Sequence, residues 1–149
     1  MGIPRHKLPP AVRELVARDE AADAARRPEG RALDVRLPYP PSVNHYWRHS
    51  RGKVYLSAEG REYRQGVADA IGRVRPLVGP VVLRLLVHPP DKRRRDLDNV
   101  LKAILDALEH AGAVRDDSQV EMLHVRRKDP RPPRGYVEVW CREMPGEPV

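Results

Sequence analysis

The chain of 149 residues carries 28 lysines and arginines against 21 acidic residues, a formal net charge of +7, and contains one cysteine, Cys141. This length fits a single domain, the lone cysteine excludes an internal disulfide, and we expect Cys141 in the hydrophobic core. The sequence has neither the roughly 20 apolar residues of a membrane span nor the apolar segment of a secretory signal, so we expect a cytoplasmic protein without a membrane partner. The positive charge favours polyanionic partners, with nucleic acid ahead of an acidic membrane surface.

Residues 1–31 are predicted to form an extension outside the domain. From Pro10 to Arg27 the sequence favours a helix, but the apolar side of that helix is narrow. The segment is either a docked accessory helix or a partly disordered arm, and we favour an arm or a loosely attached helix. We expect no catalytic residue here, and we place the domain at residues 32–142 and a short tail at residues 143–149.

The domain begins with a predicted strand from Ala32 to Leu37, where apolar and polar side chains alternate. Three prolines end this strand: Pro38, Pro40 and Pro41. The following residues 42–53 are polar, aromatic and basic and show no helical period. They predict an ordered loop that faces a ligand or solvent, with a short hairpin centred on Arg51 and Gly52.

The middle of the chain predicts a helix, a strand and a second helix. Ser57 is expected to cap the first helix, which runs to about Val74. Residues 81–87 are β-branched and apolar and predict a buried strand. The second helix, from Leu97 or Asp98 to His110, has a continuous apolar side and is therefore amphipathic.

Two final strands are predicted at residues 120–128 and 136–141, joined by a proline-rich turn. We expect this pair to form an antiparallel hairpin. The resulting order, β-α-β-α-β-β, predicts an α+β fold in which helices cover a small mixed sheet.

Acidic and basic side chains gather where the second strand meets the second helix. Asp96 and Asp98 are two residues apart, so in an extended loop both carboxylates face the same side. We expect Asp98 to cap the helix and Lys102 to lie one turn further along the same face. In the next loop, Asp116 or Asp117 is expected to cap a turn while the other reaches back to this site.

These residue types suit metal-dependent cleavage of a phosphodiester. Mg²⁺ prefers carboxylate oxygens, keeps several waters and accepts phosphate oxygens. It can activate a water and stabilise the leaving oxygen, while a lysine adds positive charge near the transition state. Four upstream cations can hold flanking phosphates: Lys92, Arg93, Arg94 and Arg95. The alternative is structural, with Asp98 only a cap, Asp96 only an ion-pair partner and Lys102 only solvated.

The loop after the first strand supplies a second set of candidate DNA contacts. Its members are aromatic or basic: Tyr46, Trp47, Arg48, Arg51 and Lys53. Aromatic rings stack on unpaired bases. The alternative is that Tyr46 and Trp47 pack on the core. The histidines lack the spacing of metal ligands and do not predict a zinc site.

Four ordered sequence blocks resemble the RusA-type Holliday junction resolvases of bacteria and their prophages. The resemblance spans roughly Leu33 to Trp140. Its blocks are Leu37 to Trp47, Ser57 to Arg64, Asp96-Leu97-Asp98-Asn99 with Lys102, and Asp106-Ala107-Leu108 with Ala111-Gly112 and Asp116 to Val120.

The resemblance implies specific roles and partners. Asp96, Asp98 and Asp117 would be the metal-binding and catalytic acids, and Lys102 an essential lysine. A homodimer would bind four-way DNA junctions and cut them by paired symmetric nicks with Mg²⁺ or Mn²⁺, in DNA recombination and repair. The sequence leaves two alternatives open, a non-catalytic DNA-binding module and a nuclease for other branched nucleic acids.

Overall fold

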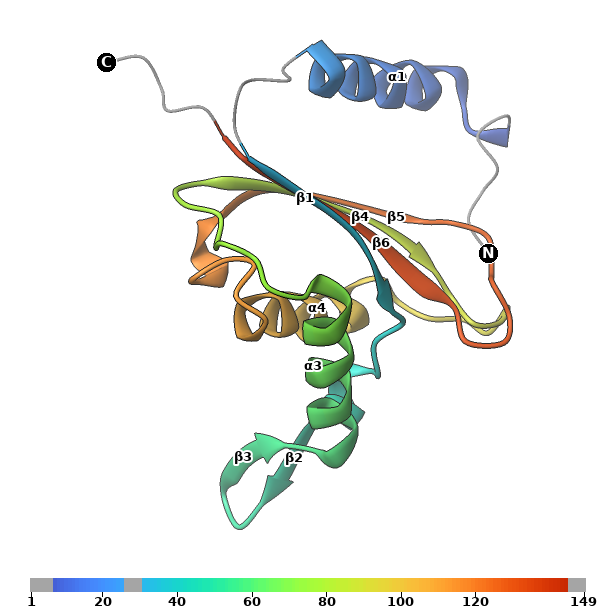
Figure 1. The fold of residues 1–149 in the computed structure, drawn as a ribbon. Coiled ribbons are helices and arrows are strands. Elements are labelled where there is room, and N and C mark those ends of the chain that lie inside the picture. The colour runs from blue at the N-terminus through green and yellow to red at the C-terminus, as the bar shows by residue number, and fades with distance from the viewer. Residues whose placement is uncertain (1–6, 26–30, 145–149) are drawn as a thin grey trace.

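A four-stranded sheet with two helices on one face forms the centre of the protein (Figure 1). The computed structural model describes residues 7–25 and 31–144. The sheet has the strand order β1-β6-β4-β5. Its strands are β1 (Ala32–Pro38), β4 (Val81–His88), β5 (Val120–Arg127) and β6 (Tyr136–Glu143). The two covering helices are α3 (Ala58–Ile71) and α4 (Asp98–His110), so the predicted α+β fold with a mixed sheet is confirmed.

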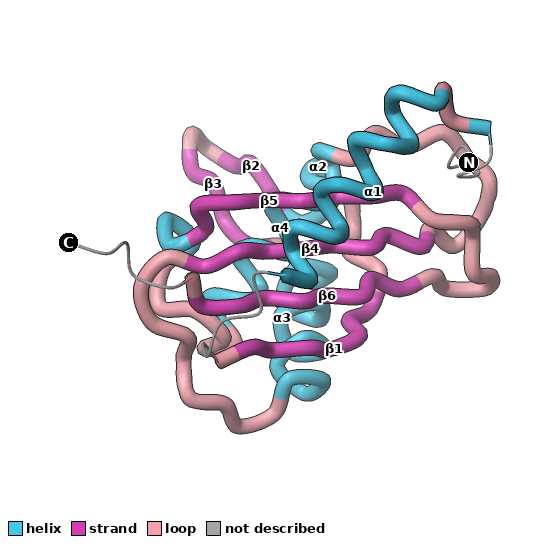
Figure 2. The backbone as a smooth tube through the Cα atoms, turned by 90° about the horizontal axis from the view of Figure 1, so that it is seen from above, coloured by secondary structure: helices cyan, strands magenta, loops and turns pink. Residues whose placement is uncertain are grey.

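The strand order corrects the expected hairpin between the last two strands. β5 pairs with β4 in parallel, and β6 lies between β1 and β4, antiparallel to both (Figure 2). Helix α4 connects β4 to β5 as a crossover, which makes these two strands parallel neighbours. The composition fits this order, because β6 buries an apolar row in the centre of the sheet, whereas β5 ends in Arg126 and Arg127 and forms an edge.

The hydrophobic core lies between the sheet and helices α3 and α4. Every second residue of the two central strands is at most 2% exposed on this face: Val81, Leu83, Leu85, Val87, Val137, Val139 and Cys141. Full burial of an aliphatic side chain contributes about 1.5–3 kcal/mol. The core position predicted for Cys141 is confirmed, and burial raises the pKa of its thiol to about 11.

The two covering helices begin differently. The Ser57 hydroxyl accepts a hydrogen bond from the Gly60 amide at 2.9 Å, as expected for the cap of α3. This helix ends earlier than predicted, at Ile71, because Gly72 takes a positive φ of 69°. Helix α4 starts with Asp98 as its first helical residue and has no side-chain cap, so the expected capping role of Asp98 is wrong.

A short helix and a two-stranded hairpin follow β1. They are α2 (Val43–Tyr46), β2 (Trp47–Ser50) and β3 (Lys53–Leu56). Arg51 and Gly52 have φ values of 50° and 74°, the pair of positive angles that suits the twist of a two-residue hairpin turn. The predicted hairpin is confirmed, and it projects away from the sheet beyond α3 (Figure 1).

The N-terminal segment forms helix α1 (Pro10–Ala25) on the side of the sheet opposite α3 and α4 (Figures 1 and 2). Val12 is 40% exposed and Leu15 is 58% exposed, so these two apolar side chains of α1 are open to solvent. Loose attachment of this helix to the domain stays a prediction. None of the described helices has the length and apolar character needed to cross a membrane.

Candidate active site

The loop between β4 and α4 is closed by an ion pair within its own sequence. The Asp91 carboxylate accepts hydrogen bonds from the Arg93 amide at 2.9 Å and from two nitrogens of Arg95 at 2.6 and 3.1 Å. The Arg95 contact, followed by the Arg93 amide, lowers the pKa of Asp91 to about 2. Arg95, predicted to contact DNA, therefore also has a structural role, and Asp91 is a structural acid that the sequence analysis did not single out.

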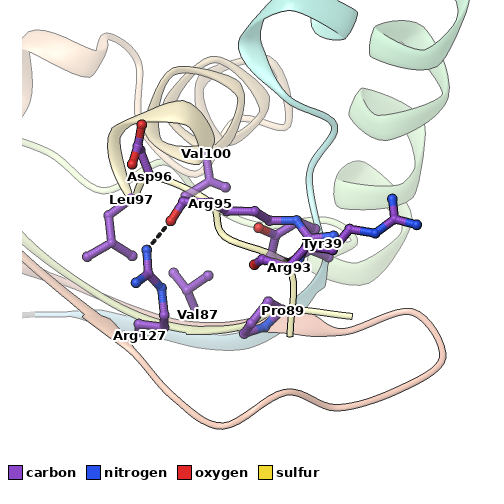
Figure 3. Close-up of a pocket in the computed structure, with 9 residues that line it drawn as sticks. All are labelled: Tyr39, Val87, Pro89, Arg93, Arg95, Asp96, Leu97, Val100 and Arg127. Carbon is purple, nitrogen blue, oxygen red and sulfur yellow. Dashed lines mark hydrogen bonds between the residues drawn. The ribbon is translucent and has the colours of Figure 1, made fainter. Parts of the chain in front are cut away.

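A second arginine holds the backbone next to Asp96. Arg127, at the end of β5, donates a hydrogen bond to the carbonyl oxygen of Arg95 (Figure 3). The Asp96 carboxylate points away from Arg127 in this view. Parallel pairing of β4 and β5 sets Arg127 opposite Val87, a long-range relation that the sequence alone does not reveal.

Asp96 and Asp98 are exposed, and among the described residues neither carboxylate has a hydrogen-bonded or ion-paired partner. This contrasts with Asp91 in the same loop. Asp98 lies in the first turn of α4, where the helix dipole favours negative charge. Lys102 is exposed on the same helix, and its position four residues later places it one turn above Asp98 on the same face.

Asp117 lies at the other end of α4 from this pair. It begins the short 3-10 helix η2 (Asp117–Gln119). Burial, followed by the negative charge of Asp117, raises the pKa of Glu109 in the last turn of α4. The 13 residues of α4 correspond to about 20 Å. Within one chain, Asp117 therefore does not reach back to Asp96 and Asp98. The described residues accordingly contain no group of three potential metal ligands.

The prediction that one aspartate of the loop between α4 and β5 caps a turn is confirmed. The Asp116 side chain accepts a hydrogen bond from the Ser118 amide at 2.8 Å, and the Gln119 side chain accepts one from the Asp116 amide at 3.1 Å. These reciprocal bonds form a capping box. Asp116 is thus the turn residue, and Asp117 is left exposed next to it.

A cleft of about 360 Å³ opens beside Asp96. It is lined by Tyr39, Pro40, Ser42, Arg94, Arg95, Asp96, Asn99 and Val100. Hydroxyl, amide and guanidinium groups therefore line the cleft together with the Asp96 carboxylate. The volume of the cleft is within the range of small-molecule binding sites. Such a lining suits one nucleotide unit of a nucleic acid. Tyr39, Ser42 and Asn99 lie in the blocks of the family resemblance but received no role there, because each is uncharged.

Tyr46 is a core residue. Its ring is 0% exposed, and its hydroxyl donates a hydrogen bond to the Asp106 carboxylate. Arg64 also binds Asp106, at 2.8 and 3.0 Å. Burial and the bond to Asp106 raise the pKa of Tyr46. The ring cannot stack on a base in this structure, so the packing alternative holds for Tyr46.

The remaining candidate DNA contacts lie in two places, on the hairpin and on the loop before α4. Trp47 is half-buried and packs edge-on against Tyr46, with ring centroids 5.1 Å apart. Arg48, Arg51 and Lys53 are exposed. On the loop before α4, Lys92, Arg93 and Arg94 are exposed as well. These cations are accessible to a DNA backbone, and their contacts with DNA stay predictions.

Comparison with known proteins gives the family. The family model described as endodeoxyribonuclease RusA matches residues 38–140, a range that includes all four candidate catalytic residues. Proteins named crossover junction endodeoxyribonuclease RusA are 46% identical in Escherichia coli strain K12, 46% in Enterobacteria phage 82 and 45% in Shigella sonnei strain Ss046. Each match covers 116 residues, which is 76% of this chain and 96% of the relative. The chain therefore belongs to the RusA family of endodeoxyribonucleases.

Proposed function

We propose that this protein resolves four-way DNA junctions by Mg²⁺-dependent hydrolysis, as a step in DNA recombination and repair. The observation that carries the proposal is the pair of exposed carboxylates of Asp96 and Asp98, which have no partner among residues 7–25 and 31–144, in a strongly basic loop. A protein that only bound DNA would gain affinity by losing these negative charges. The names of the relatives from Escherichia coli and phage 82 support a crossover junction as the substrate.

The residues of the site fit a hard divalent cation, and each group of residues has a separate role around it. Asp96 and Asp98 offer the carboxylate oxygens that Mg²⁺ or Mn²⁺ binds. Such a cation, when bound, polarises the scissile phosphate and lowers the pKa of a water. Lys102 adds positive charge one helical turn away, where negative charge develops in the transition state. The exposed cations of the preceding loop hold the flanking phosphates: Lys92, Arg93 and Arg94.

Asp117 joins this site if the protein is a two-fold dimer. The outer edge of β5 is unpaired among the described strands. In an antiparallel pairing of two β5 edges, the start of each strand lies beside the end of the other. Asp117 just precedes β5, and Arg127 at its end is bonded next to Asp96. Each Asp117 would thereby approach the acids of the other copy.

Two-fold symmetry also suits the substrate, because a dimer presents two identical sites to a nearly two-fold symmetric junction. Paired symmetric nicks follow from that arrangement. Mixing two inactive variants, Asp98→Asn and Asp117→Asn, tests it. In a mixed dimer, one of the two composite sites keeps every acid, so after subunit exchange about a quarter of the sites are intact.

Cleavage of a labelled junction is the measurement for this mixture. Recovery of cleavage, with neither variant active alone, is the expected outcome. A mixture that stays as inactive as its components, although pull-down through a tag on one variant shows that mixed dimers have formed, would contradict the composite site.

The function itself is tested with a panel of DNA substrates. The purified protein is incubated with labelled four-way, three-way and duplex DNA of matched sequence, with and without Mg²⁺. We expect symmetric nicks that are confined to the four-way substrate and that require the metal. Binding without cleavage at any metal concentration would instead identify a non-catalytic DNA-binding module, and preferred cutting of another branched substrate would reassign the substrate.

A further inference from the structure

The β2–β3 hairpin exposes an aromatic ring that the sequence analysis did not consider. Tyr55 is 49% exposed although it lies in a strand. Tyr55 is paired with Arg48 across the hairpin, and Lys53 is paired with Ser50. Residues that are paired across an antiparallel hairpin, and residues two apart in one strand, point to the same face. One face of the hairpin therefore presents a tyrosine ring together with the cations Arg48 and Lys53.

The base of the hairpin is firmly attached to the rest of the domain. The buried Ser57 side chain donates to the Tyr46 carbonyl at 3.0 Å, and the Ser57 amide donates to the same oxygen at 3.0 Å. Gly60 packs so closely that a Cβ atom would lie 2.6 Å from this carbonyl. The Tyr46 hydroxyl in turn binds Asp106 of α4. The hairpin is thus held at one end and projects into solvent at the other (Figure 1).

The hairpin leaves the domain close to the acidic site. Ser42 lines the cleft beside Asp96, and only the short helix α2 separates Ser42 from the start of β2 at Trp47. Each hairpin strand has four residues and is about 13 Å long, which corresponds to about four base steps of DNA. DNA with a phosphate in the cleft can therefore meet the hairpin a few nucleotides away.

We propose that Tyr55 stacks on a base at the point of strand exchange, with Arg48 and Lys53 on the adjacent phosphates. The proposal rests on the proposed function, since a branch point is where bases are unstacked and accessible. Exposed aromatic rings bind such bases through stacking, and neighbouring cations bind the backbone. The role considered for Tyr46 from the sequence thus passes to Tyr55, because Tyr46 is buried and Tyr55 is not.

Fluorescence of 2-aminopurine at the branch point of a four-way junction tests this stacking. The full-length protein and its variants are titrated in EDTA, so that no strand is cut. We expect the wild type to change the fluorescence and Tyr55→Ala to lose most of that change, with about tenfold weaker binding of the four-way junction. Tyr55→Phe keeps the ring and should behave as the wild type. Val54→Ala is the matched control, because Val54 is 59% exposed and adjacent in sequence but points to the opposite face.

The outcomes separate this inference from the proposed function. If the wild type neither binds nor cuts four-way DNA, the proposed function fails and the inference fails with it. If the wild type cuts the junction and Tyr55→Ala matches Val54→Ala in fluorescence and affinity, the stacking role is wrong and the proposed function stands. If Tyr55→Ala and Val54→Ala lost the fluorescence change and the junction affinity equally, with unchanged melting temperatures, the stacking role would also be wrong. The loss would then not depend on the Tyr55 ring.

Discussion

Helix α4 carries two aspartates, Asp98 and Asp106, whose surroundings differ sharply. Asp106 faces α3 and accepts hydrogen bonds from Arg64 and from the buried hydroxyl of Tyr46. Asp98, two turns earlier, is exposed and has no such partner among the described residues. The loop before α4 repeats the contrast, with Asp91 paired to Arg95 and Asp96 unpaired. The set of partners, rather than the residue type, therefore separates structural acids from acids available for chemistry.

The largest effect is expected from Asp98→Asn. Loss of a carboxylate ligand should reduce the rate of junction cleavage by at least about a hundredfold. Mutating even a residue that only hydrogen-bonds to a metal ligand typically lowers metal affinity or activity by about 10–100-fold. Junction affinity should persist, and stability should change by less than about 1 kcal/mol, the usual scale of a charge in the first turn of a helix. Single-turnover cleavage and urea unfolding measure the two quantities. Cleavage at the wild-type rate would remove Asp98 from the site.

Asp106→Ala should show the reverse pattern, with a loss of stability of about 2 to 4 kcal/mol. The substitution leaves the Arg64 guanidinium and the Tyr46 hydroxyl without their shared acceptor. Asp69→Ala is the control, since Asp69 is exposed and, in the part of the chain that the structure describes, is hydrogen-bonded only to Gln65; it should change stability by less than about 0.5 kcal/mol. Equal urea midpoints for the two variants would show that the network around Asp106 contributes little.

The smallest expected effect is on the acid dependence of stability. Burial, the largest single influence, raises the pKa of Asp106, but the bonds from Arg64 and Tyr46 outweigh it and the pKa is lowered overall. The folded state therefore binds fewer protons here than the unfolded state. This stabilisation is present above the unfolded carboxyl pKa of about 4 and is lost as the pH falls through the lower folded value. Asp106→Asn should flatten the fall in stability below about pH 4, measured by urea unfolding from neutral to acidic pH. An unchanged slope would contradict the assignment.

Local chemistry made several elements predictable from the sequence. The Ser57 hydroxyl acts within its own turn, and the Arg51-Gly52 turn is set by two backbone angles. The period of apolar residues in α4 likewise depends on neighbours three and four positions away. The positions of Asp96, Asp98 and Lys102 around the start of this helix followed from the same signals.

Long-range relations were not predictable. Whether Tyr46 packed inside or faced DNA depended on Asp106, Arg64 and the close approach of Gly60, which the local pattern around Tyr46 does not encode. The expectation that Asp117 returned to the other acids failed within one chain, because a parallel crossover sets the start of β5 at the far end of α4. The strand order was unpredictable for the same reason. Alternation of apolar and polar residues indicates a strand but does not indicate which strands pair with it.

The central position of β6 has a consequence for the newly made chain. Strand β1 pairs only with β6 in the described sheet. Ala32 at its start therefore cannot pair until Arg142 has been synthesised. Strand β4 obtains its second neighbour from the same late segment. While the ribosome is still completing the protein, β1 therefore has no partner and β4 keeps an open apolar edge, a state that favours slow folding and aggregation. The last segment of the domain to be synthesised is the one that joins its halves.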